Sequence, residues 1–298
     1  MFGLSPHFEC EVSETTEIDK YLKIAQKYEI RVFHRFSTSH DDLIHDVSYD
    51  FYGKRLATCS SDQKIKVWDM NDSGKWELSA EWKAHSGSVW KVAWTHPEFG
   101  QVLASCSFDR TVCIWEEGED EKGQKKWNLK ATLVDSRDSV TDIKFSPKSF
   151  GLRLATSSCD GLVLSSGHHH HHGHHHTGST SSSSMSSDPS ESPKTIHDVS
   201  WAPNMGRSYH LIAAASKDHN VRIWKVSNNE KSKMEIKEVL CNPLHKAEVW
   251  RVEWNITGTI LASSGDDGNV FLWKCNNNGE WKLLSSISGE EETDPLMK

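Results

Sequence analysis

The sequence contains no apolar run that approaches the length of a membrane span, and its first residues lack the basic region and apolar core of a signal peptide. It has 34 Lys and Arg against 42 Asp and Glu, a formal net charge of −8, and no block of basic residues stands out. We therefore expect no transmembrane segment and no direct nucleic-acid partner. The expected compartment is the cytosol or the nucleus.

Motifs of metal binding and catalysis are also absent. The seven cysteines form no Cys-x-x-Cys pair, and Cys59, Cys106, Cys113 and Cys159 lie in apolar strand-like runs, where we expect buried thiols. The sequence has no phosphate-binding glycine loop, His-Glu-x-x-His helix or Gly-x-Ser-x-Gly turn. We expect no catalytic residue, no cofactor and no enzymatic activity.

What the chain does have is a repeat. LATCSSDQKIKVWD, LASCSFDRTVCIWE, IAAASKDHNVRIWK and LASSGDDGNVFLWK each place small residues before an Asp and a Trp six positions after it. A fifth copy, LATSSCDGLV, keeps the Asp but has Ser166 where the Trp should fall. The Asp residues are about 50 positions apart, close to the roughly 40–45 residues of one four-stranded WD40 blade. The repeated residues are Asp62, Trp68, Asp109, Trp115, Asp160, Asp218, Trp224, Asp267 and Trp273.

Further strand-like segments surround each of these copies. LIHDVSYD, SVWKVAW, SVTDIKF, TIHDVSW and EVWRVEW precede them, and WELSAEW, WNLKATL and WKLLSSI follow. Apolar and polar residues alternate in these runs with the period of two that is typical of β-strands. A four-stranded sheet cannot bury both of its faces alone, so such sheets stack around a channel. The sequence predicts an all-β WD-repeat propeller.

The repeats divide the chain into five parts. Residues 1–39 are an N-terminal extension, and residues 40–166 hold three blades, of which the third is incomplete because it stops after Val163. Residues 167–194 are a His- and Ser-rich low-complexity insert that cannot form a core. Residues 195–288 hold two C-terminal blades, and residues 289–298 are an acidic tail.

Three features could suggest chemistry or binding. Ser, His and Asp recur together, but a catalytic triad occurs once per site and this set repeats with the blade, which favours an architectural role. The tract from His168 to His176 could chelate a metal only adventitiously, because it lies in a segment without an ordered surrounding. Trp90 and Trp250 are candidates for partner binding, because exposed Trp is favoured at interfaces; packing between blades is the alternative.

The repeats, together with HSGSVWKVAWTHPEFGQVLASCSFDRT, TLVDSRDSVTDIKFSPK and APNMGRSYHLIAAASKD, resemble the WD-repeat nucleoporins of the Sec-thirteen-homologue (Seh-one) family. The resemblance covers most of residues 40–165 and 195–275. It implies an open propeller of six blades, so that one degenerate blade and one missing blade are expected here.

WD proteins in general carry a hydrogen-bonded tetrad in each blade, formed by the Trp, a Ser or Thr, the turn Asp and a His ahead of the first strand. The resemblance places His40, His85 and His245 at the His position. Ser136 and Ser192 stand there in the third and fourth copies, so we expect incomplete tetrads in those two blades.

The resemblance also implies a function. Members of this family are scaffold subunits of the Y-shaped complex of the nuclear pore, which serves transport of protein and mRNA. They also belong to the GATOR-type complex that regulates target-of-rapamycin signalling at the cytosolic face of the lysosome or vacuole. The implied partners are an α-solenoid nucleoporin that inserts a blade in trans, other Y-complex nucleoporins and GATOR-type subunits. The implied location is the nuclear envelope and its pore complexes.

The last repeat already has its own outer strand in WKLLSSI, so the N-terminal segment is not needed to close the ring by strand exchange. We therefore expect the first and last blades, at about residues 44–69 and 249–273, to expose faces and edges that contact the partner. The alternative function is that of a Sec-thirteen-like coat-vesicle subunit in export from the endoplasmic reticulum.

Overall fold

The computed structural model describes residues 35–166, 181–184, 194–228 and 234–289. Contacts divide the chain into two units, Met1–Ser39 and His40–Lys298, and every sheet lies in the second. The His168–His176 tract, Ser192 and nearly all of the acidic tail lie outside the described residues. In the described part of the chain, none of the helices has the length and apolar character needed to cross a membrane.

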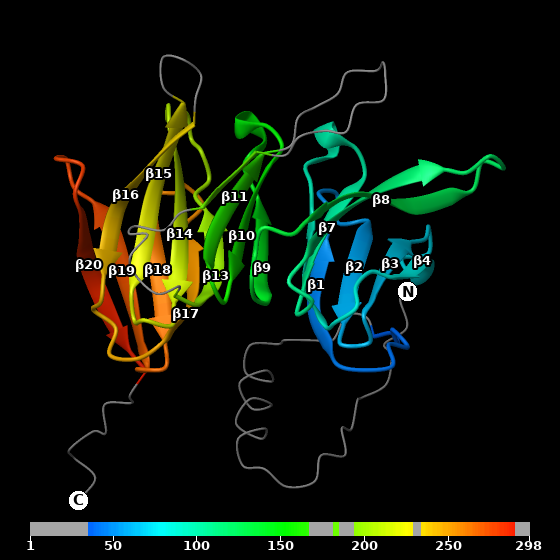
Figure 1. Cartoon of the computed structure of the whole chain (residues 1–298), viewed down its shortest axis with the longest axis horizontal. Coiled ribbons are helices and arrows are strands. Elements are labelled where there is room, and N and C mark those ends of the chain that lie inside the picture. The colour runs from blue at the N-terminus through cyan, green and yellow to red at the C-terminus, as the bar shows by residue number, and fades with distance from the viewer. Residues whose placement is uncertain (1–34, 167–180, 185–193, 229–233, 290–298) are drawn as a thin grey trace, which may run out of the picture. The chain divides into compact units, whose positions relative to one another are not determined.

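The second unit consists of five antiparallel sheets, each made of four strands that pair in chain order, as the colours of Figure 1 show from blue to red. The first sheet contains β1 (Ile44–Tyr49), β2 (Arg55–Ser60), β3 (Lys64–Met70) and β4 (Trp76–Lys83). The second contains β5 (Val89–Trp94), β6 (Val102–Ser107), β7 (Val112–Glu119) and β8 (Lys125–Leu133). The third contains β9 (Val140–Phe145), β10 (Arg153–Ser158), β11 (Gly161–Ser166) and β12 (Ser181–Ser184).

The fourth sheet contains β13 (Ile196–Trp201), β14 (His210–Ser216), β15 (Val221–Asn228) and β16 (Met234–Asn242). The fifth contains β17 (Val249–Trp254), β18 (Ile260–Gly265), β19 (Asn269–Cys275) and β20 (Trp281–Ser288). Two 3₁₀ turns, η1 (Pro97–Phe99) and η2 (Lys148–Phe150), each connect the first two strands of a blade.

The recurring Asp forms the turn between the second and third strands of a blade. Its carboxylate accepts a hydrogen bond from the backbone N–H two residues later, for example from Lys64 to Asp62 at 2.9 Å and from Asn269 to Asp267 at 3.1 Å. Short acidic side chains stabilise turns in this way. The residue after the Asp has a positive φ, which is 71° at both Gln63 and Gly268. The repeated Asp therefore sets the hairpin that carries the Trp strand.

The third blade differs from the sequence-based expectation. The prediction that it lacks its third strand is wrong, because β11 pairs with β10 from Gly161 opposite Ser158 to Ser166 opposite Arg153. The short strand β12 then pairs with β11, so the insert of residues 167–194 contributes an edge strand to the blade. Backbone hydrogen bonds build a ladder without any particular side chain, so loss of the Trp at Ser166 did not prevent pairing. The blade is degenerate in side chains but not in strand number.

Neighbouring blades pack face to face through their first strands. β1 lies beside β5, β5 beside β9, β9 beside β13 and β13 beside β17. An apolar cluster fills each of these four junctions; Ala57 and Ile65 of the first blade, for example, pack with Val92 and Leu103 of the second. In the described ranges no cluster and no strand contact of comparable extent joins the fifth blade to the first. The protein is an open WD-repeat β-propeller.

A pair of hydrogen bonds, which we call the inter-blade latch, recurs at three junctions. Between the first and second blades, Asp46 Oδ2 accepts from the backbone N–H of Val92 at 3.2 Å. The indole N–H of Trp94 donates to the carbonyl oxygen of Ser48 at 3.0 Å. At the third junction, the backbone N–H of Val199 donates to Asp142, and the indole of Trp201 donates to the carbonyl oxygen of Lys144. At the fourth, the backbone N–H of Val252 donates to Asp198, and the indole of Trp254 donates to the carbonyl oxygen of Ser200.

The latch is encoded by an Asp at the third position of one first strand and a Trp at the sixth position of the next. Lys91 and Phe145 occupy these positions at the second junction, where the latch is not formed. Arg251 of the last blade and Tyr49 of the first blade also lack the required groups. The two blades beside the opening therefore do not carry the residues that would latch them to each other.

The latch predicts a specific loss of stability in Trp254→Phe. Trp254 is buried, and the phenyl ring would leave the Ser200 carbonyl without its indole donor. We expect the free energy of unfolding to fall by about 1–3 kcal/mol more than in the matched change Trp127→Phe, measured by urea denaturation. Trp127 is also buried, but its indole nitrogen has no hydrogen-bond partner within the described residues. Equal losses in the two variants would contradict a stabilising latch.

Candidate partner-binding surfaces

The fifth blade carries a complete tetrad. The Nδ1 atom of His245 lies 3.0 Å from Asp267, and its Nε2 atom lies 2.8 Å from the hydroxyl of Ser263. The indole nitrogen of Trp273 donates to the same hydroxyl at 2.9 Å. Because an ionised carboxylate can only accept, Nδ1 donates to Asp267 and Nε2 accepts from Ser263. Every polar group of this buried network is satisfied.

The first two blades repeat this arrangement. The distances from His40 and His85 to the turn Asp are 2.7 and 3.0 Å, and those to the central hydroxyl are 2.9 and 2.8 Å. Burial lowers the pKa of His85, and Asp109 only partly offsets this effect, which favours the neutral imidazole. The full residue sets are His40, Asp62, Thr58 and Trp68, and His85, Asp109, Ser105 and Trp115.

The third and fourth blades depart from the tetrad. In the third, the backbone N–H of Arg137, next to Ser136, donates to Asp160 at 2.8 Å. In the fourth, Asp218 pairs with Arg222, with 2.6 Å between Oδ2 and Nη2. Burial alone would raise the pKa of Asp218, but the hydrogen bonds from Arg222 and Ser216 hold it well below its usual range.

Trp224 is buried in the cluster between the third and fourth blades. Its indole has no hydroxyl to meet in its own blade, because Ala214 stands at that position. The tetrad residues thus hold individual blades together, and the network varies from blade to blade without changing the strand pattern.

The first blade exposes a face that every other blade buries. Val47 is 56% exposed, whereas Val92, Ile143, Val199 and Val252, at the same position of the other first strands, are at most 4% exposed. Those four side chains contact the preceding blade, and the first blade has no preceding blade. An apolar side chain at this position is therefore suited to contact with another sheet.

Further residues enlarge this surface on both sides of the opening. Tyr49 is 59% exposed, whereas Trp201 and Trp254 at its position are 8% and 6% exposed. On the fifth blade, Val270 and Leu272 are only half-buried, although the corresponding residues of the first blade are fully buried against the second. We call Val47 and Tyr49 on one side, and Val270 and Leu272 on the other, the gap faces. They fall within the predicted ranges 44–69 and 249–273.

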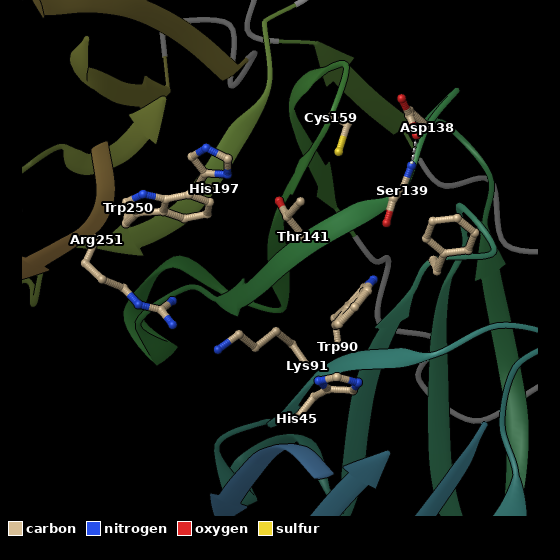
Figure 2. A pocket seen from close by; sticks show the side chains of 11 residues that line it. His45, Trp90, Lys91, Asp138, Ser139, Thr141, Cys159, His197, Trp250 and Arg251 are labelled. Carbon is tan, nitrogen blue, oxygen red and sulfur yellow. Dashed lines mark hydrogen bonds between the residues drawn. The ribbon is translucent and has the colours of Figure 1, made fainter. Parts of the chain in front are cut away.

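Trp90 and Trp250 lie elsewhere, in a pocket lined by the first strands (Figure 2). Each contacts a His of the preceding blade: Trp250 stacks on His197 with ring centroids 3.9 Å apart, and Trp90 meets His45 in a tilted arrangement with centroids 4.3 Å apart. Each indole therefore packs across a blade junction, as the second alternative predicted, and each also lines the pocket; partner binding by these residues stays a prediction. Trp250 remains 43% exposed.

The sequence did not reveal the His partners of Trp90 and Trp250, nor which residues within the ranges 44–69 and 249–273 are exposed at the opening. His45 and His197 both occur in Ile-His-Asp-Val, and this shared motif was the available signal. Among the described residues, no group of His, Cys, Asp or Glu is arranged to hold a metal ion.

The tetrad predicts a large effect of Ser263→Ala on stability. Removal of this hydroxyl would leave the buried indole N–H of Trp273 and the Nε2 atom of His245 without partners. We expect the free energy of unfolding to fall by about 2–4 kcal/mol, measured by chemical denaturation. The neighbouring Ser264→Ala, which lies outside the tetrad, should cost less than about 1 kcal/mol. A similar cost for both would show that the tetrad contributes little.

Comparison with known proteins agrees with this architecture. The WD domain, G-beta repeat family matches residues 30–69, 76–116, 188–225 and 237–274, leaving the degenerate third blade unmatched. Nucleoporin SEH1 of Homo sapiens is 44% identical over 317 residues, covering 85% of this chain and 87% of that protein. Nucleoporin SEH1-A of Xenopus laevis is 43% identical over 316 residues, covering 85% of this chain and 88% of that protein. With this identity, the repeat pattern and an open propeller, the chain belongs to the SEH1 nucleoporin family of WD-repeat proteins.

Proposed function

We propose that this protein is a non-enzymatic scaffold subunit of the Y-shaped complex of the nuclear pore, located at the nuclear envelope and acting in transport of protein and mRNA. Its open propeller accepts an α-solenoid nucleoporin, which supplies a blade in trans between the gap faces. The relatives that carry the name nucleoporin support the assignment to the pore. The observation that carries the mechanism is the exposure of Val47 at a position buried in all four other blades.

The gap faces provide binding free energy for such a partner and also fix how its sheet packs on the first and fifth blades. Full burial of an exposed Val or Leu side chain contributes about 1.5–3 kcal/mol. Covering Val47 and Tyr49, and the parts of Val270 and Leu272 that are still exposed, therefore accounts for a substantial part of a binding free energy. A partner sheet that reproduced the blade packing would contact Val47 as the first blade contacts Val92. Only a polypeptide that presents a strand-rich apolar face meets this requirement.

The same opening suits a second assembly. We propose that a GATOR-type subunit with an equivalent inserted blade binds there too, which would place the protein in target-of-rapamycin regulation at the lysosome or vacuole. The two partners would compete for one site. The likeness to SEH1 nucleoporins favours these assemblies over the alternative of a Sec-thirteen-like coat subunit, which would place the protein at endoplasmic-reticulum exit sites.

The trans-blade mechanism predicts that Val47→Glu weakens partner binding. The protein would be co-expressed with an α-solenoid nucleoporin from the same organism and recovered through an affinity tag on that partner. We expect recovery to fall at least about tenfold, because a carboxylate would be buried without a counter-charge. Leu129→Glu is the matched control, since Leu129 is 53% exposed on β8, away from the opening, and should leave recovery unchanged.

Two results would overturn the mechanism. One is partner recovery that is equal for wild type and Val47→Glu when both are folded by circular dichroism. The other is a wild-type protein that stays monomeric in the presence of the partner. Imaging of a fluorescent fusion at the nuclear rim, the lysosome or endoplasmic-reticulum exit sites separates the assemblies.

A further inference from the structure

The pocket in Figure 2 is built from two copies of one arrangement. On one side, His45 from β1 contacts Trp90 from β5 with the two rings tilted by 57°, and Lys91 follows Trp90 in the strand. On the other side, His197 from β13 stacks on Trp250 from β17, and Arg251 follows it. Each copy combines an imidazole, an indole and a cation from two adjacent blades. We call these the two half-sites. The pocket between them has a volume of about 720 Å³, within the roughly 300–1,000 Å³ of ligand-binding sites.

Ring nitrogens of His45, His197 and Trp250 are already hydrogen-bonded within the protein. The Nε2 atom of His197 lies 2.9 Å from Glu248, and that of His45 bonds to the hydroxyl of Ser61. The indole nitrogen of Trp250 donates to Asp266 at 2.8 Å. These bonds fix the rings in place and leave aromatic surface toward the pocket. Pre-positioned aromatic side chains lose little conformational entropy when a partner binds, which makes them suited to anchoring an apolar side chain.

The cations of the half-sites are only loosely paired. The ammonium of Lys91 lies 3.9 Å from Asp46, and the guanidinium of Arg251 lies 3.7 Å from Asp198. Both of these carboxylates are already committed to inter-blade latches. Arg251 keeps 61% of its side chain exposed. Each cation therefore retains donors for an incoming carboxylate.

The balance of charge at the pocket is positive in an otherwise acidic chain. Its lining contains Lys91 and Arg251 but only one acidic residue, Asp138, whose carboxylate accepts a 2.6 Å hydrogen bond from the backbone of Ser139. The formal net charge of the protein is −8. Burial, together with the neighbouring Asp198, raises the pKa of Asp142 above its usual range. Phe108, 63% exposed, adds a third aromatic ring to the lining.

We propose that this pocket is a second partner-binding site, which takes a peptide segment in which an aromatic side chain is flanked by acidic residues. The aromatic side chain packs against Trp90 and Trp250, and the flanking carboxylates pair with Lys91 and Arg251. The site is distinct from the gap faces, because its lining contains none of the four gap residues. The protein could therefore bind such a segment while a blade occupies the opening.

A fluorescein-labelled peptide with the sequence Asp-Glu-Phe-Glu-Asp tests the proposal by fluorescence anisotropy on the full chain. We expect saturable binding in the range of about 10–100 µM, which corresponds to about −5 to −7 kcal/mol. Replacement of the four acidic residues by Lys, or of the Phe by Ala, should weaken binding at least about tenfold. Absence of saturable binding up to about 1 mM, or equal binding of the Lys peptide, would overturn the proposal.

Substitutions of pocket residues test whether the peptide binds at this pocket. Arg251→Gln, Lys91→Gln and Trp250→Ala should each weaken peptide binding about tenfold, or about 1.4 kcal/mol. Lys130→Gln is the control, since Lys130 is 54% exposed on β8 and lies outside the pocket. Circular dichroism checks folding, and the two Gln variants, which remove no packed ring, carry the test if Trp250→Ala is unfolded. Wild-type affinity in all three variants would refute the site.

The two binding sites can be told apart in one set of proteins. Val47→Glu should lose the α-solenoid partner and keep the peptide, whereas Arg251→Gln should lose the peptide and keep the partner. Loss of both ligands in Arg251→Gln would show one continuous surface and overturn the second site.

Discussion

Packing of one four-stranded sheet on the next is the interaction on which the rest of the structure depends. Each blade has two apolar faces, and each face is buried only where a neighbour covers it. The inter-blade latches fix the orientation of that packing at three of the four junctions. Where the series of blades ends, the same physics leaves Val47 and its neighbours in water. The opening therefore lies between the fifth and first blades, the one pair of neighbours that no apolar cluster joins within the described ranges.

The hydrogen bonds that stabilise a single blade are distinct from the apolar packing between blades. The tetrads of the first, second and fifth blades join the loop before the first strand to the turn after the second. The fourth blade replaces this network with the Asp218–Arg222 pair, and the third keeps only part of it. All five nevertheless have four strands, because the backbone ladder carries the sheet. The tetrad therefore varies from blade to blade, whereas an apolar cluster fills every junction between consecutive blades.

The two proposed binding sites differ in chemistry because they differ in origin. The gap faces are interior surfaces without a neighbour, so they select an apolar sheet of the same geometry. The channel pocket is lined mainly by residues at the second and third positions of the first strands, where neighbouring blades meet. Trp90, Trp250, Lys91 and Arg251 occupy these positions with groups suited to an acidic, aromatic segment.

The sequence alone determined the propeller, because the spacing of Asp62, Asp109, Asp218 and Asp267 and the Trp six positions after each report local geometry: a hairpin turn and the strand that follows it. The tetrad positions and the open ring were expected from the resemblance to a known family and not from the spacing itself. Local signals could not show whether the third blade completes its ladder, because pairing of Gly161–Ser166 and Ser181–Ser184 depends on the strand beside them and not on a side-chain pattern.

Only the tertiary structure decided which apolar residues are left uncovered and which distant side chains meet. Val47 and Val92 look alike in sequence, and the presence or absence of a preceding blade separates their environments. The ring contacts of His45 with Trp90 and of His197 with Trp250 likewise arise where two blades meet. Contacts of this kind join residues some 45 to 55 positions apart, a separation set by blade stacking and beyond the reach of any local periodicity.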